Sequence, residues 1–386
     1  MLDSLTIKNF RALADFSVAR LGRVNLIVGK NNSGKSSVLE ALRIYAGNGQ
    51  RELLDSISAE HDERYRVRES ESPEPDAPMP LQDFFTGRNF PTDDGTDIQI
   101  GSALKPEEVL HVQHIFLAEE REPVIDELGE TTIRVRRRIV PKNQLQNETG
   151  ELRQALQITK GERRYPPFFL DWSYPRPRSP LLESTNSIPC SVIPTQFISS
   201  DELADEWDKI ALTEYAEVVK QAMRIIAPEF ENLNFVRNDE GRTAARTSFQ
   251  RSAKVKLSDM PRPVPLNSLG DGMLRVLQLA LKLFPAKGGF LLIDEFENGL
   301  HYSVQEKIWT LLFEMAERLD IQVFATTHSW DCIESFTKVA VARQDIDGVL
   351  FRMGRSVRTS DNGRIISTVF DEAALAKITQ ADVEVR

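Results

Sequence analysis

The hydrophobic pattern at the start of the chain predicts a strand, a loop and a helix in succession. Residues 5–10 alternate between apolar and polar side chains, and residues 24–28 form an apolar run that ends at Gly29. Apolar side chains then recur with helical spacing through residues 37–45. This order predicts a βα unit whose connecting loop spans residues 29–36.

A second set of regular elements begins at Pro265. The hydrophobic pattern predicts two amphipathic helices, at residues 273–284 and 303–319, and two buried strands, at residues 290–293 and 321–325. A hairpin is predicted from residues 349–352 and 365–370, because the Asp361-Asn362-Gly363 sequence between them is typical of a turn. Helices that alternate with buried strands predict an α/β fold.

The residues between these two sets follow a different pattern. Residues 96–200 are rich in strand-forming sequences, with alternation at 131–136 and an apolar run at 190–194, whereas residues 201–227 have helical spacing. An acidic, proline-rich stretch near residues 69–80 is expected to be a mobile surface loop. The apolar stripe of the helical part consists of Leu212, Tyr215, Val218, Val219, Ala222 and Ile225.

The α/β pattern is thus split by a long insertion. The predicted parts are an N-terminal half-domain at residues 1–46, a β-rich and helical insertion at 47–264, a C-terminal half-domain at 265–345, and a hairpin with its tail at 346–386. Because only the two half-domains carry the regular α/β pattern, we expect them to fold back on each other into one domain.

Composition narrows the class of protein. A net charge of −10 argues against a protein that coats nucleic acid through general basicity, although arginines gather at residues 134–138. No apolar run approaches the ~20 residues that cross a bilayer, and the N-terminus lacks the pattern of a secretory signal. The two cysteines, Cys190 and Cys332, cannot form a disulfide framework. We therefore expect a cytoplasmic protein with no membrane partner.

The loop at residues 29–36 matches the phosphate-binding pattern G-x-x-x-x-G-K-[ST] at every fixed position. Its two glycines let backbone N–H groups approach phosphate oxygens. Lys35 supplies a charge to the β and γ phosphates, and the Ser36 hydroxyl is suited to magnesium. A glycine-lysine surface turn would show the same letters, but the flanking strand and helix favour a phosphate loop. The expected nucleotide contacts are Gly29, Lys30, Asn31, Asn32, Ser33, Gly34, Lys35, Ser36 and Ser37.

The predicted strand at residues 290–293 ends in two carboxylates, Asp294 and Glu295. Asp294 is expected to hold Mg²⁺ together with Ser36, directly or through water. Glu295 is expected to orient or deprotonate the water that attacks the γ-phosphate, a role that requires a carboxylate close to this phosphate. The predicted cofactors are therefore ATP and Mg²⁺. The predicted reaction is ATP hydrolysis, with Lys35 and Glu295 in catalytic roles.

Further segments resemble one group of ATPases. Ser268-Leu269-Gly270-Asp271-Gly272 precedes the Asp-Glu strand, and Thr326-Thr327-His328-Ser329 ends the next strand. This order is that of ABC-type ATPases. The resemblance is narrowed to OLD/RecF-like ATPases (overcoming lysogenization defect), relatives of the SMC and RecF ATPase heads, by Ile7-Lys8-Asn9-Phe10-Arg11 and Glu297-Asn298-Gly299-Leu300-His301. It covers residues 1–45 and 265–335 well.

The resemblance implies a P-loop NTPase of the ABC-ATPase head type that works as a homodimer or larger assembly. It implies that His328 is a switch histidine in catalysis, that Arg11 contacts the nucleotide, and that residues 297–301 lie at the dimer seam. It also implies that the nucleotide of another subunit is contacted by Ser268, Gly270 and Gly272. The glutamine of the magnesium-linked loop stays open among Gln99, Gln113 and Gln196.

The same resemblance implies a role in bacterial anti-phage defence, as an ATPase that controls a separately encoded effector. Related proteins often carry a Toprim nuclease, whose Asp-x-Asp pattern occurs here only at Asp345-Ile346-Asp347, and we expect these residues in the turn before the final hairpin. The protein is thus expected to lack its own nuclease. Two alternatives are a DNA repair or replication ATPase that clamps nucleic acid, and a nucleotide-gated scaffold that hydrolyses ATP poorly.

Three other patterns carry less information. His111 and His114 have the spacing of metal ligands but lack nearby cysteines or carboxylates in sequence, so we expect no metal there. The arginines at 134–138 fit either nucleic-acid phosphates or a solvated strand face. Cys332 has no obvious base beside it and is expected to pack in the core.

Overall fold

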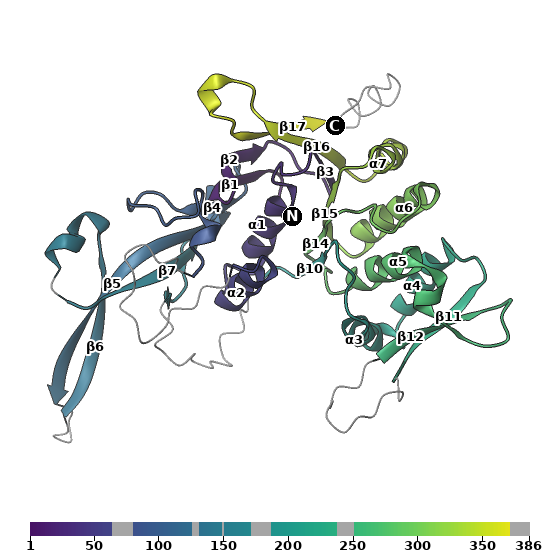
Figure 1. Ribbon diagram of the computed structural model, residues 1–386, viewed down its shortest axis with the longest axis horizontal. Coiled ribbons are helices and arrows are strands. Elements are labelled where there is room, and N and C mark those ends of the chain that lie inside the picture. The colour runs from purple at the N-terminus through teal and green to yellow at the C-terminus, as the bar shows by residue number, and fades with distance from the viewer. Residues whose placement is uncertain (64–79, 126–130, 149, 171–186, 238–250, 371–386) are drawn as a thin grey trace.

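A computed structural model describes residues 1–63, 80–125, 131–148, 150–170, 187–237 and 251–370 (Figure 1). Of the acidic stretch near residues 69–80, all but the last residue lies outside the described residues. Among the residues described, no helix is both long enough and apolar enough to cross a bilayer.

The centre of the fold is a six-stranded sheet with strand order β10-β14-β15-β3-β16-β17. All neighbouring pairs in it are parallel except β16 and β17, which form the predicted C-terminal hairpin. The strands are β3 (Val24–Val28), β10 (Cys190–Ile193), β14 (Phe290–Ile293), β15 (Gln322–Thr327), β16 (Gly348–Arg355) and β17 (Ile365–Phe370). Strand β10 comes from the predicted insertion, so the insertion contributes to the sheet that carries the phosphate loop.

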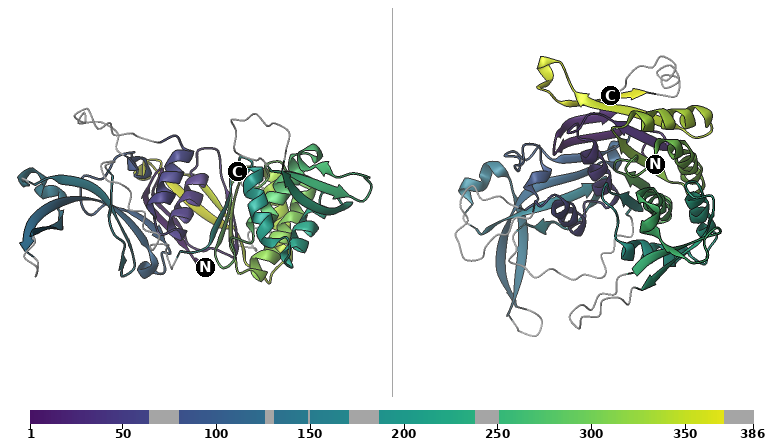
Figure 2. Two further views of the ribbon diagram at one scale, coloured as in Figure 1. Left: turned by 90° about the horizontal axis from the view of Figure 1, so that it is seen from below. Right: turned by 45° about the vertical axis from the view of Figure 1, so that its right-hand side comes forward.

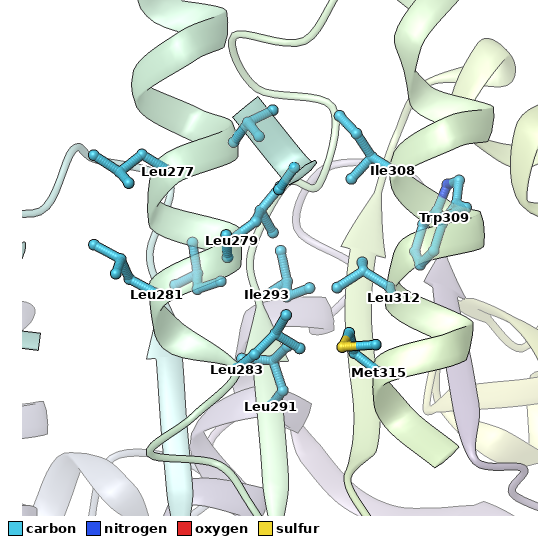
Figure 3. Close-up of a cluster of buried hydrophobic side chains, with 14 of the residues drawn as sticks. Leu277, Leu279, Leu281, Leu283, Leu291, Ile293, Ile308, Trp309, Leu312 and Met315 are labelled. Atoms are coloured by element: carbon cyan, nitrogen blue, oxygen red, sulfur yellow. The ribbon is translucent and has the colours of Figure 1, made fainter. Parts of the chain in front are cut away.

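Helices cover one face of this sheet (Figure 1). They are α3 (Ser200–Ile210), α4 (Tyr215–Arg224), α5 (Asp271–Lys282), α6 (Tyr302–Arg318) and α7 (Trp330–Ala342). Alternate residues of β14 point to opposite faces, as they must in a strand, and Leu291 and Ile293 belong to the core on the helical side. Figure 3 shows these two side chains between the leucines of α5 and, from α6, Ile308, Trp309, Leu312 and Met315.

The other face of the sheet packs against a second core, to which Phe290 and Leu292 of β14 belong. Helices α1 (Lys35–Ala46) and α2 (Arg51–Glu60) lie on this side, together with an antiparallel sheet of strand order β2-β1-β4-β5-β7-β8. Its strands are β1 (Leu5–Phe10), β2 (Leu13–Val18), β4 (Ile98–Gly101), β5 (Leu110–Ile125), β7 (Leu152–Lys160) and β8 (Arg163–Arg164). The N-terminal hairpin β1–β2 is therefore continuous with strands of the insertion.

Two short additions complete the fold. Strand β6 (Thr131–Val140) pairs with β5 in a hairpin that extends away from the body, and β9 (Phe168–Phe169) pairs with β7 (Figure 2). A small sheet beside α3 and α4 consists of β11 (Phe230–Arg237), β12 (Arg251–Leu257) and β13 (Val264–Pro265).

The helical stripe predicted for residues 201–227 was wrong in one respect. The structure has two helices there, α3 and α4, and Leu212 lies in the turn between them with its side chain fully exposed. The predicted apolar stripe is confirmed within α4, where Val218, Val219 and Ala222 are buried. Helical spacing therefore continued through a turn that carried no glycine or proline to mark it.

Candidate active site

The phosphate loop connects β3 to α1, and its backbone is bent so that glycine is required at two points. Gly34 has φ +88°, which is in the left-handed region, and it is the residue before α1. A Cβ at Gly29 would lie 2.6 Å from the carbonyl oxygen of Met353 and 2.7 Å from Ser33 Oγ. Strand β16 thus packs directly against the loop, and Ser33 Oγ is buried without a hydrogen-bond partner. An orphaned hydroxyl in this loop fits a site that accepts a further polar ligand.

Lys35 is the first residue of α1 and is half-buried. Its Nζ donates to the carbonyl oxygens of Gly29, at 2.8 Å, and Lys30, at 3.2 Å. Burial lowers the pKa of Lys35, and the nearby carboxylates of Asp294, Glu295 and Glu297 oppose this shift. The ammonium group is therefore held at the loop and faces three acidic side chains.

Asp294 follows β14 and lies opposite the start of α1. Its two carboxylate oxygens are 3.4 and 3.3 Å from Ser36 Oγ. Two threonines orient the same carboxylate: Thr326 Oγ1 donates to Oδ1 at 2.6 Å and Thr195 Oγ1 donates to Oδ2 at 3.2 Å. The hydroxyl and carboxylate oxygens of Ser36 and Asp294 are ligands that Mg²⁺ prefers, and a magnesium site with few protein ligands relies on phosphate oxygens for the rest. These residues therefore fit the predicted metal.

Glu295 has a strained backbone, with φ +47°, and its N–H donates to Thr326 Oγ1 at 2.9 Å. His328, just beyond β15, approaches it: the distance from His328 Nδ1 to Glu295 Oε1 is 3.8 Å. Glu297 lies closer, with 3.2 Å between its Oε1 and the same nitrogen, and it also accepts the His328 backbone N–H at 3.0 Å. The side chains of His328 and Glu295 are 52% and 38% exposed, so both are accessible from solvent.

Sequence reasoning missed Arg275, which lies on α5 with no exposed surface. Its guanidinium donates to the carbonyl oxygens of Asp294 and Glu295, each at 2.8 Å, and to that of Pro194 at 2.8 Å. Burial lowers the pKa of Arg275 to about 10, which the three acidic side chains nearby oppose. Arg275 thus fixes the backbone that carries the Asp294 and Glu295 carboxylates. No signal in one sequence distinguishes it from an arginine on the solvent side of a helix.

Sequence reasoning also missed the structural roles of Thr195 and Glu297. Thr195 follows β10, and its carbonyl oxygen accepts a hydrogen bond from Asn298 Nδ2 at 2.6 Å.

Of the three glutamines left open, Gln196 adjoins Thr195 at this edge of the parallel sheet. Gln99 and Gln113 lie on β4 and β5, where they bond to Asp97 and to the carbonyl oxygen of Asp94.

The Ser268–Gly272 segment lies at the exposed start of α5. Ser268 Oγ donates to the carbonyl oxygen of Pro265 at 2.6 Å. Gly270 has φ +90° and faces open space, since a Cβ there would meet nothing within 4 Å. Gly272 packs against Gly299, because a Cβ at Gly272 would lie 3.1 Å from the carbonyl oxygen of Gly299. None of these contacts links the segment to the phosphate loop of the same chain.

The structure does not support Arg11 as a nucleotide contact in its present conformation. Arg11 Nε lies 2.7 Å from Glu40 Oε2, and its two terminal nitrogens donate to Glu63 at 3.0 and 3.1 Å. The guanidinium carbon is also 5.0 Å from the ring centre of Phe84. Two carboxylates therefore hold the guanidinium, which cannot contact phosphate without leaving them.

The remaining sequence patterns make ordinary packing and polar contacts in the part of the chain that the structure describes. His111 bonds to Asp97, whereas His114 is buried and stacks on Phe90, and no metal-binding cluster occurs among the residues described. Asp345 and Asp347 lie in the turn before β16, as predicted, and pair with Arg343 and Arg20. Cys332 is fully buried, and burial raises the pKa of its thiol well above its usual range, which agrees with a packing role.

Two arginines of β6, Arg137 and Arg138, pair with acidic side chains. Arg137 Nε lies 3.1 Å from Glu119 Oε1, and Arg138 bonds to Glu148 at 2.7 Å. These arginines are exposed on the hairpin that leaves the body of the molecule. Their ion pairs fit a solvated strand face.

Comparison with known proteins agrees with this geometry. Residues 24–331 match a family described as "AAA domain, putative AbiEii toxin, Type IV TA system". A protein of Helicobacter pylori (strain ATCC 700392 / 26695) named "ATP/GTP phosphatase" is 25% identical over 361 residues, which cover 88% of each chain.

Solved structures of SMC heads also resemble the chain. One, an SMC head bound to the C-terminal winged-helix domain of ScpA, is 15% identical with a TM-score of 0.49 and covers 98% of this chain and 99% of its own. Another, an SMC head with an extended coiled coil bound to the C-terminal domain of ScpA, derived from Pyrococcus furiosus, is 12% identical with a TM-score of 0.48 and covers 99% of each chain.

Proposed function

The chain belongs to this family of AAA domains, and we propose that its ATPase site is the space between the phosphate loop and the Asp294-Glu295 strand end. The observation that carries the proposal is the contact between Ser36 and Asp294, whose oxygens lie 3.3 Å apart although the residues are 258 positions apart in the chain. A phosphate loop and an acidic strand end meet in this way where a metal-bound triphosphate is held. The name of the Helicobacter pylori relative supports hydrolysis of the nucleotide.

Each side chain has a distinct role in this proposal. Lys35 leaves the loop carbonyls that it now contacts and pairs with the β and γ phosphates. Glu295 orients or deprotonates the attacking water, and His328 stabilises charge on the transferred phosphoryl group. Glu297 keeps His328 in place through the contacts to its ring and backbone. Mg²⁺, when held by Ser36 and Asp294, neutralises phosphate charge.

We also propose that a second copy of the chain completes the site. Ser268 and Gly270 are exposed at the start of α5, where backbone N–H groups are free to bind an anion. Gly299 packs on this helix start, and Tyr302 beside it is 63% exposed although it is large and apolar. Such a surface suits contact with the nucleotide bound by another subunit and with residues 297–301 of that subunit. ATP binding would then favour the closed dimer, and hydrolysis would favour its opening.

A Glu295→Gln variant tests this proposal. It keeps the size of the side chain but removes the carboxylate, so we expect ATP turnover to fall by about 100-fold or more while ATP still binds. Size-exclusion chromatography with light scattering should then show a stable dimer with ATP and Mg²⁺. Glu229→Gln, at an exposed residue before β11, is the matched control and should behave as wild type. A variant that stays monomeric with ATP bound would contradict the dimer.

The biological role that we propose is bacterial anti-phage defence in the cytoplasm, through control of a separately encoded effector. The family description, which names a toxin of a type IV toxin–antitoxin system, supports this direction. Phage plating on cells that express the native operon should fall at least ~10-fold, and Glu295→Gln should abolish this protection. Equal plating with and without the operon would contradict the role.

The two alternative functions predict different biochemical results. ATP turnover that rises several-fold with added DNA would favour a repair or replication ATPase that clamps nucleic acid. Tight ATP binding with negligible turnover by the wild-type chain would favour a nucleotide-gated scaffold. Purification from the native host, followed by mass spectrometry of what co-elutes, identifies the effector if there is one.

A further inference from the structure

A cavity of about 420 Å³ lies at the opposite end of α1 from the phosphate loop. Tyr45, in the last turn of α1, and Phe290, the first residue of β14, are part of its lining. The same two elements lead to Lys35 and Asp294 at their other ends. The cavity is therefore separate from the proposed ATPase site but shares a helix and a strand with it.

The cavity has the size and the walls of a small-molecule site. Its volume falls within the ~300–1,000 Å³ that such sites occupy. Leu2, Ile188 and Phe290 supply apolar surface, whereas charge comes from Lys105, Glu108, Lys160 and Asp320, the last of which pairs with Arg23 at 3.0 Å. Gly288 forms part of the rim, and a Cβ there would meet nothing within 4 Å.

Hydrogen bonds fix two walls of the cavity. Gln322 is buried, and its side chain binds the backbone of Leu2 at 2.8 Å and 2.7 Å. On another wall, the backbone N–H of Ile188 donates to the carbonyl oxygen of Ala46 at 3.0 Å. A pre-formed wall loses little conformational entropy when a ligand binds.

Lys160 is the feature that indicates the charge of the ligand. Its Nζ donates to the carbonyl oxygen of Tyr45 at 3.3 Å and to Asn48 Oδ1 at 3.0 Å, and it lies 3.8 Å from the ring centre of Tyr45. Among the described residues, no carboxylate lies within 4.0 Å of this nitrogen. Burial lowers the pKa of Lys160 to about 8, against a weaker opposing effect of Glu108. Even a half-buried ammonium is costly without an ion partner, and an approaching anion would remove this cost.

We propose that this cavity is a second ligand site, which takes a small anion carried on an apolar or aromatic body. The phosphate or carboxylate would lie between Lys160 and Lys105, and the body would lie against Ile188 and Phe290. Lys105, at the more exposed side, has Asp3 Oδ2 at 3.6 Å, a distance that leaves it able to turn toward an anion. The ATPase site uses none of these residues, so the two sites can be tested separately.

Pyridoxal 5′-phosphate is a probe that combines the three features: a phosphate, an aromatic ring and an aldehyde that reports amines. The neutral amine of Lys160 adds to the aldehyde carbon, water leaves as the imine forms, and borohydride reduces the imine to a stable secondary amine. Mass spectrometry of the digested full-length chain then measures modification at each lysine. We expect Lys160 to be labelled at least ~10-fold faster than exposed Lys307. Pyridoxal without phosphate should label Lys160 at least ~10-fold more slowly.

Two variants and two competitors give the controls. Ile188→Trp fills the cavity and Lys105→Glu reverses a charge at its rim, and each should reduce labelling of Lys160 by ~5-fold or more without changing labelling of Lys35. ATP with Mg²⁺ should protect Lys35 and leave Lys160 reactive, whether or not the chain hydrolyses ATP. Protection of Lys160 by inorganic phosphate would assign the site to phosphate esters, and protection by octanoate would assign it to carboxylates. Labelling of Lys160 that matches Lys307, or that neither variant and neither competitor reduces, would overturn the proposal.

Discussion

The two ends of helix α1 each hold a half-buried lysine, and their surroundings differ. Lys35, at the first residue of the helix, faces Asp294, Glu295 and Glu297. Lys160, from strand β7, lies over the last turn of the helix, and among the described residues no carboxylate is within 4.0 Å of its Nζ. Burial lowers the pKa of both lysines.

The comparison shows that a buried lysine does not by itself identify the chemistry of a site. At Lys35 the acidic side chains outnumber the lysine, so the site needs a cation as well as an anion, and a metal-bound triphosphate supplies both. Of the other charged side chains that line the cavity at Lys160, Lys105 pairs with Asp3 and Asp320 pairs with Arg23, and the remaining Glu108 only weakly opposes the lowered pKa of the lysine. An anion would therefore balance the charge of Lys160. The neighbours of each lysine therefore predict different ligands.

The largest expected effect is at Lys35. Lys35→Met removes the ammonium that pairs with the β and γ phosphates, so ATP turnover should fall by about 100-fold or more, measured by phosphate release. Lys307→Met, at an exposed residue of α6, is the matched control and should keep wild-type turnover. If the Lys35 variant retained more than about a tenth of the activity, the assignment of the phosphate loop would be wrong.

Arg275 should give the next largest effect, because it fixes the carboxylates that distinguish the Lys35 end. Arg275→Met leaves the carbonyl oxygens of Pro194, Asp294 and Glu295 without their donor. We expect about 3 kcal/mol lower stability toward urea, from about 1 kcal/mol for each lost hydrogen bond. We also expect kcat to fall by about 10-fold, with little change in KM for ATP.

The control for Arg275 is Arg275→Lys, which keeps one charged donor and should recover part of kcat. If Arg275 only stabilised the fold, both variants would lose activity in proportion to the fraction of protein that is unfolded. Rates measured at a urea concentration where both variants are fully folded separate these outcomes.

The same substitution, glycine to alanine, compares the packing of the backbone near the two ends of α1. Gly34 and Gly288 both have positive φ, at +88° and +75°, so alanine strains either backbone by about 1–2 kcal/mol. At Gly34 the new Cβ would also lie 3.1 Å from Leu13 Cδ2 and 3.2 Å from Ile365 Cδ1, whereas at Gly288 it meets open space. Gly34→Ala should therefore destabilise the fold more than Gly288→Ala in urea titrations. Equal losses would mean that the hairpin β16–β17 does not press on the phosphate loop.

Prediction from the sequence was successful for elements whose residue pattern lies within one short segment. The strands β3, β14 and β15, and the glycine loop before α1, were predicted from local patterns, and the α/β class follows from their order. The structure brings Ser36 and Asp294 together, although their roles in hydrolysis stay predictions.

The features that sequence reasoning missed depend on contacts between distant segments. Thr195 meets Asp294 only because β10, from within the insertion, pairs with β14. Arg275 is buried only because three backbone carbonyls from two loops accept its hydrogen bonds. The cavity at Lys160 is formed where β7, α1 and the start of β14 meet. These long-range contacts leave no local pattern in the sequence, so a single sequence does not predict them.

The smallest expected effect concerns pH and tests the unpaired state of Lys160. Its pKa is about 8 in the folded chain and 10.5 when unfolded, so from pH 8 upward the unfolded chain binds more protons and stability toward urea should rise with pH. Two groups oppose this contribution of Lys160, because each has a higher pKa in the folded chain, which then binds more protons. Cys190 opposes it above pH 9, since its pKa rises from 9.0 to about 12 on folding, and Tyr45 opposes it above pH 10, since its pKa rises from 10.0 to about 12. Between pH 8 and 10, Lys160→Met should show a smaller rise than wild type, whereas Lys307→Met should not. An unchanged rise in the Lys160 variant would mean that a carboxylate or another anion already balances this lysine in solution.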